Sequence, residues 1–97
     1  MVQQHTERQM ASSFKVTENI GVLSSWKSEA RNTDNSKEVN KVSWNERNPV
    51  VDIRSWWVDE TGVKKPGKGI TLNDREARKL CEYLISCGYN EKVVEEQ

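Results

Sequence analysis

The stretch that decides the fold is VVDIRSWWVDETGVKKPGKGITLN, residues 50–73. Residues 50–58 are rich in β-branched and aromatic side chains, which favour a β-strand. Alternation along this strand separates two faces, one with Val51, Ile53 and Ser55 and the other with Asp52, Arg54 and Trp56. A turn signal at residues 59–62 opens a loop that is predicted to continue through residue 67. Residues 68–72 then return as a strand with Ile70 and Leu72 facing the core, so the stretch predicts an antiparallel hairpin.

Upstream of this hairpin the sequence predicts two further strands, at residues 14–23 and 39–45. Both alternate apolar and polar residues, and Gly21 marks an expected bulge in the first. Val42 and Trp44 share one face of the second strand, while Lys41 falls on the other. Residues 24–37 are rich in Ser, Asn, Asp and Lys, so they are predicted to form a long loop with Trp26 as its one aromatic residue.

Downstream, Asn73 is a predicted N-cap, followed by carboxylates in the first helical turn. An apolar stripe at helical spacing and Gly88 as the C′ residue complete the helix. The expected fold class is therefore α+β, a curved four-stranded antiparallel sheet followed by one C-terminal helix. The helix covers one face only. The other face carries Arg54, with Lys41 and Lys15 expected beside it, and is free for solvent or for binding.

Composition sets the size and the expected environment of the protein. The chain has 97 residues, of which 34% are apolar and 31% charged, and its net charge is zero. We expect a leader at residues 1–13, disordered, one domain at 14–88 and a flexible tail at 89–97. A domain this small buries little apolar surface, so we expect a second copy of the chain to complete the core in a homodimer. No apolar run has the length of a signal peptide or membrane span, and Cys81 and Cys87 cannot bridge within a helix. We therefore expect a cytoplasmic protein that can associate with the nucleoid.

The residue types that catalysis needs are missing from the expected domain. The single histidine, His5, lies in the leader, which argues against a histidine-based triad and against a metal site. Gly67-Lys68-Gly69 lacks the upstream glycine and the Lys-Ser/Thr ending of a phosphate loop. We therefore expect no enzyme, no cofactor and no metal.

Aromatic and basic residues are concentrated between residues 44 and 68. Single-stranded nucleic acid is bound by this combination, because bases stack on flat side chains while lysine and arginine contact phosphates. Trp44 shares a face with Val42 and is better explained as a core residue than as a stacking residue. The adjacent Trp56 and Trp57 must face opposite ways. The lysines alone would also suit a solvated loop, so composition leaves the function open. The residues in question are Trp44, Arg54, Trp56, Trp57, Lys64, Lys65 and Lys68.

The segment from residue 50 to 73 resembles the central hairpin of the transcriptional coactivator positive cofactor 4 family. In that family a D-I-R strand, with a tryptophan three residues after the arginine, leads through a Pro-Gly loop into K-G-I-(S/T)-L-N and a helix. FKVTENIGVLS, EVNKVSWN, DIRSW and GKGITL resemble its short bacterial YdbC-type branch more closely, and the likeness covers about residues 14–86. Gly67 stands where the eukaryotic members have a further basic residue, and their long Ser/Lys-rich N-terminus is absent.

The resemblance implies a dimeric, non-sequence-specific binder of single-stranded DNA, or of RNA, acting in transcription, replication or repair of a bacterium or phage. Arg54, Trp57, Lys68 and Gly69 match the family's groove residues. The residues expected to hold phosphates are Lys41, Arg54, Lys64, Lys65 and Lys68. Trp57 is expected to stack on bases, with Trp56 assisting. Two alternatives stay open: a transcription-associated module whose main partner is a protein, with nucleic acid secondary, and a purely structural dimer in which Arg54 and Trp57 are packed internally.

Overall fold

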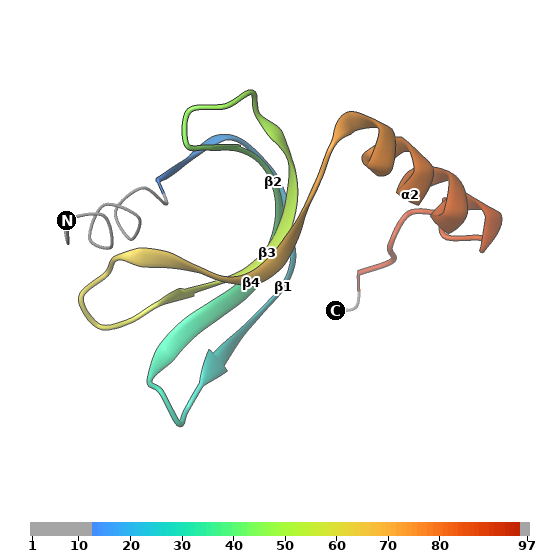
Figure 1. Cartoon of the computed structure of the whole chain (residues 1–97). Coiled ribbons are helices and arrows are strands. Elements are labelled where there is room, and N and C mark those ends of the chain that lie inside the picture. Colours follow the sequence, from blue (N-terminus) through green and yellow to red (C-terminus); the bar gives the residue numbers. More distant parts are fainter. Residues whose placement is uncertain (1–12, 96–97) are drawn as a thin grey trace.

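The computed structural model describes residues 13–95, so most of the expected leader lies outside the described part of the chain. Four strands are followed by one helix: β1 (Phe14–Ser28), β2 (Thr33–Trp44), β3 (Val50–Val58), β4 (Lys64–Leu72) and α2 (Asp74–Ser86). The strands form one antiparallel sheet in the order β1-β2-β3-β4, which confirms the predicted fold class. Figure 1 shows the sheet strongly curved, with α2 beyond its convex side.

The predicted long loop at residues 24–37 is wrong, because most of it is strand. β1 continues to Ser28 and β2 begins at Thr33, so only residues 29–32 join them. The reason is tertiary: residues 34–42 of β2 pair along the whole of β3, which supplies backbone hydrogen-bond partners whatever the side chains are. The last hairpin loop is likewise shorter than predicted, since β4 starts at Lys64 rather than Lys68.

Helix α2 has the caps that the sequence predicted. The Asn73 side chain accepts a hydrogen bond from the Glu76 backbone, and the Glu76 carboxylate accepts one from the Asn73 backbone, which forms a capping box. At the other end Gly88 takes φ +88°. Its N–H donates to the Ile85 carbonyl, and that of Tyr89 donates to Leu84, a Schellman ending. Within residues 13–95 no helix is both long and apolar enough to cross a membrane.

Strand register divides the side chains between two faces. Val51 and Ile53 lie on the helix-side face, where with Val39 and Leu72 they line a hollow of about 420 Å³ against α2. The residues that alternate with them along β3, including Asp52, lie on the opposite, concave face. Val42 pairs with Val50 and is therefore concave as well. The apolar pair Val42 and Trp44 of β2 and the apolar residues Val51 and Ile53 of β3 thus lie on different faces of the sheet.

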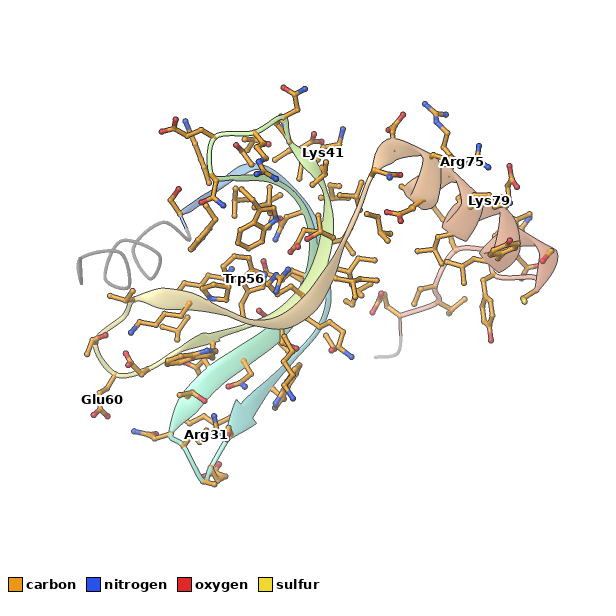
Figure 2. The ribbon with its side chains drawn as sticks, viewed as in Figure 1. Arg31, Lys41, Trp56, Glu60, Arg75 and Lys79 are labelled. Carbon is orange, nitrogen blue, oxygen red and sulfur yellow. The ribbon has the colours of Figure 1, made fainter. Side chains whose placement is uncertain are left out.

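The closed core lies in the concave face. Val42 and Trp56 are 0% and 2% exposed, while no residue of α2 is buried. Figure 2 shows Trp56 inside the curve of the sheet. Because the sheet bends around them, these side chains are enclosed by their own strands without a covering layer. The helix-side hollow stays open by comparison, with Leu84 44% and Ile85 51% exposed.

Candidate nucleic-acid interface

Arg54, the arginine expected to hold phosphate, is engaged within the concave face. Its Nε and Nη2 donate to the two oxygens of Asp52 at 2.9 and 2.8 Å, and Nη1 donates to the Gly67 carbonyl at 2.9 Å. Thr71 also donates to Asp52, which is 0% exposed. An arginine bound in this bidentate way neutralises a buried carboxylate, so its first role is structural.

Three aromatic rings pack together on this face, and one of them lies against Arg54. The Phe14 ring centroid lies 5.7 Å from that of Trp44 and 5.6 Å from that of Trp56, both tilted. The Arg54 guanidinium lies 4.9 Å from the Trp44 ring centroid, a cation–π distance. Trp44 and Trp56 are therefore occupied by packing, which agrees with the interpretation of Trp44 as a core residue.

Lys64 is also engaged on the concave face. Its Nζ lies 2.7 Å from the Glu38 carboxylate and 5.4 Å from the Trp56 ring centroid. Burial by itself would raise the pKa of Glu38. Hydrogen bonds from Lys64, Ser36 and Asn40 outweigh it, so the pKa of Glu38 lies below its ordinary value of 4.5. Glu38 is thus a charged, fully partnered acid beneath the lysine.

Position 69 must be glycine, because it lies in close contact with Arg54 on the neighbouring strand. It pairs with Arg54 across β3 and β4, and a Cβ built on it would lie 2.5 Å from the Arg54 Cβ and 2.5 Å from the Ile53 carbonyl oxygen. No side chain fits there. The resemblance pointed to this glycine as part of the groove, and the structure shows that the strands could not approach so closely with another residue.

The other predicted site residues lie on the helix-side face, contrary to the expected single groove opposite the helix. Lys41 pairs with Val51 and Lys15 with Ser43, which are helix-side positions, so the expectation that both lie beside Arg54 is wrong. Trp57 pairs with Asn35 and Lys65, also on that face. For the two lysines the cause is register, since a shift of one residue between strands moves every side chain to the opposite face. Trp57 lies there because side chains alternate along β3, which places it opposite Arg54 and Trp56.

We call the positive part of this face, which is exposed or half-buried, the basic strip. Lys65 Nζ lies 5.4 Å from the Trp57 ring centroid. Among the ion pairs formed within residues 13–95, none involves a lysine of the strip, in contrast to Arg54 and Lys64. These cations are therefore available to phosphate. The strip consists of Lys37, Lys41, Trp57, Lys65 and Lys68.

Lys37 is the residue of the strip that sequence reasoning missed. It pairs with Ser55 and lines, with Lys68 and Ile53, a shallow hollow on the helix-side face. The sequence placed it in a loop, because its neighbours are Ser, Asn and Asp. The alternation of Asn35, Lys37 and Val39 was the only signal, and it becomes informative once β2 is known to extend that far.

A curved, open sheet with a closed concave face and a basic, aromatic surface on the other defines a class of small sheet-based binding domain. Residues 31–83 match the family model described as Transcriptional Coactivator p15 (PC4), more than half of the chain. An uncharacterized protein of Treponema pallidum (strain Nichols) is 37% identical over 77 residues, 75% of this chain and 76% of that protein. The chain belongs to the Transcriptional Coactivator p15 (PC4) family, which supports nucleic-acid binding in general.

Proposed function

We propose that this protein binds single-stranded DNA, and by the same chemistry RNA, without sequence preference, on the helix-side face of its sheet. The observation that carries the proposal is the basic strip, in which Lys65 lies beside the Trp57 ring and no lysine forms an ion pair within residues 13–95. Stacking on an aromatic ring accepts any base, and lysine contacts to phosphate carry no sequence information. Arg54 and Lys64 are held by Asp52 and Glu38, so we assign them to the scaffold beneath.

Two adjacent lysines test the choice of face. Lys65 lies beside Trp57 on the helix-side face, whereas Lys64 is bound to Glu38 on the concave face. Fluorescence titration with oligo-dT at two salt concentrations should show tryptophan quenching and weaker binding at higher salt. Lys65→Gln should weaken binding and reduce the slope of log K against log salt by about 0.7. Lys64→Gln is the matched control and should leave that slope unchanged.

The opposite results are equally informative. Equal effects of the two lysine variants would contradict the assignment to the helix-side face. Unchanged fluorescence of the wild-type protein at micromolar concentration would reject nucleic-acid binding altogether and favour a module whose main partner is a protein.

We further propose that the protein works as a homodimer through α2. The apolar stripe of the helix is only partly covered, and the hollow between α2 and the sheet is lined mainly by apolar side chains. A second copy supplies the missing apolar surface. Light scattering should give the mass of a dimer, and Leu84→Asp should give a monomer. Arg75→Asp, on the same helix but outside the hollow, should remain dimeric; a monomeric wild type would overturn the proposal.

The cellular setting follows from family and chemistry. We propose a bacterial or phage member of the YdbC-type branch that acts in the cytoplasm on exposed single strands in transcription, replication or repair. We also propose that it is not an enzyme. The buried carboxylates that might have served as acids or bases, Asp52 and Glu38, are each held by structural partners.

A further inference from the structure

Trp26 is a large aromatic residue that the proposed function has not used. It lies in β1, is 44% exposed, and belongs to the segment that composition described as a loop. Its side chain position is fixed by register: Trp26 pairs with Asn35 on β2, and Asn35 pairs with Trp57 on β3. Directly opposed residues in a sheet point to the same face. Trp26 and Trp57 therefore stand on the helix-side face, two strands apart.

These pairings produce two rows that cross the sheet at right angles to the strands. The first row, the aromatic row, holds Trp26, Asn35, Trp57 and Lys65. The second, the basic row, holds Ser24, Lys37 and Ser55, with Lys68 beside them across the β3–β4 bulge.

The spacing of the rows suits a single nucleic-acid strand. Residues two apart on one face are separated by about 6.6 Å along a strand, so the basic row lies one such step from the aromatic row. Neighbouring strands lie about 4.8 Å apart, so the two tryptophans stand roughly 10 Å from each other across β2. That separation allows each ring to stack on a different base, with the Asn35 amide between them.

We propose that Trp26 is a second base-stacking residue, so that the bound strand crosses the sheet from β4 to β1 with its bases over the aromatic row and its phosphates over the basic row. This inference rests on the proposed function and extends it, because it names the path of the ligand and adds the first hairpin to the site. The β1–β2 hairpin thereby becomes a binding element rather than a connection.

The test is the dependence of affinity on oligonucleotide length. Oligo-dT of increasing length is titrated into the wild-type protein and into Trp26→Ala, Trp26→Phe and Trp57→Ala. Losing one stacked base should weaken binding of long oligonucleotides by about 5- to 140-fold in Trp26→Ala. The shortest oligonucleotides that bind measurably, which reach only one ring, should be affected much less. Trp26→Phe keeps a ring and should lie between.

Leu23→Ala is the matched control, since Leu23 is in the same strand and 60% exposed. It should bind as the wild type does at every length. Cross-linking of a 5-iodouracil oligonucleotide to the unmodified protein, mapped by mass spectrometry, gives an independent measurement should the alanine variant fail to fold. Cross-links at both Trp26 and Trp57 are expected.

Two outcomes separate this inference from the function on which it rests. Wild-type affinity at all lengths in Trp26→Ala, or cross-links at Trp57 without Trp26, would overturn the second stacking residue while Trp57→Ala still weakens binding. Absence of binding by the wild-type protein would overturn both.

Discussion

Replacing Arg54 with alanine should destabilise the fold, although the family resemblance identifies this residue as a ligand contact. The change removes the guanidinium that makes two short hydrogen bonds to Asp52, whose side chain is 0% exposed, and it leaves the Gly67 carbonyl without its donor. Among the described residues, the Thr71 hydroxyl is then the one remaining donor to the carboxylate. A buried charge is therefore left almost unpaired.

The expected loss is about 3–5 kcal/mol in the free energy of unfolding, the usual cost of removing one partner of a buried ion pair. This approaches the whole stability of a small domain, about 5–15 kcal/mol. Adding Asp52→Asn should recover part of the loss, because a neutral amide can remain hydrogen-bonded to Thr71 without an unpaired charge. Urea unfolding followed by tryptophan fluorescence, at one fixed protomer concentration, measures both variants.

The matched control is Arg78→Ala, which also removes an arginine from an ion pair. Arg78 and its partner Asp74 are 76% and 80% exposed, so the expected loss is only about 0–0.5 kcal/mol. The reasoning would be refuted if Arg54→Ala lost less than about 1 kcal/mol, or if Asp52→Asn did not improve the stability of that variant.

Three further results are expected. Gly69→Ala should cost about 1–3 kcal/mol in urea unfolding, because the added Cβ would overlap Arg54 and the backbone. Gly21→Ala should be near neutral, since a Cβ added there has no atom of residues 13–95 within 4 Å. The pKa of Glu38 is lowered in the folded state, so its contribution to stability is full above pH 4.5 and is lost as the pH falls through the folded value. Glu38→Gln should accordingly lose less stability on acidification than the wild type, and parallel curves would contradict this. Asn73→Ala should lower the stability by about 1 kcal/mol through loss of the cap, measured by thermal unfolding against Asn90→Ala.

The sequence predicted the elements whose signals are local. Alternation identified β3, the Asn73 cap and Gly88 bounded α2, and apolar spacing identified the stripe of the helix. Signals of this kind depend on one residue and its near neighbours in the chain. The polar ends of β1 and β2 carried no such signal, since their strand conformation comes from pairing with each other and with β3. The sequence therefore identified Trp26 as an aromatic residue, but it did not predict the strand that holds it or the face on which it lies.

By itself the sequence determined the α+β class, the order of four strands and a helix, and the set of aromatic and basic residues from which the interface is built. Alternation also separated Arg54 and Trp56 from Trp57 within β3, but only the tertiary structure decided which residues of the other strands share each face. Trp56 lies in the closed concave core with Arg54 beside it, and the half-exposed Lys64 lies on the same face. Trp57, Lys65 and Lys68 remain on the open helix-side face with Lys37 and Trp26. The physical reason is that alternation determines which side chains of one strand share a face. The register between strands determines which face of the neighbouring strand they join.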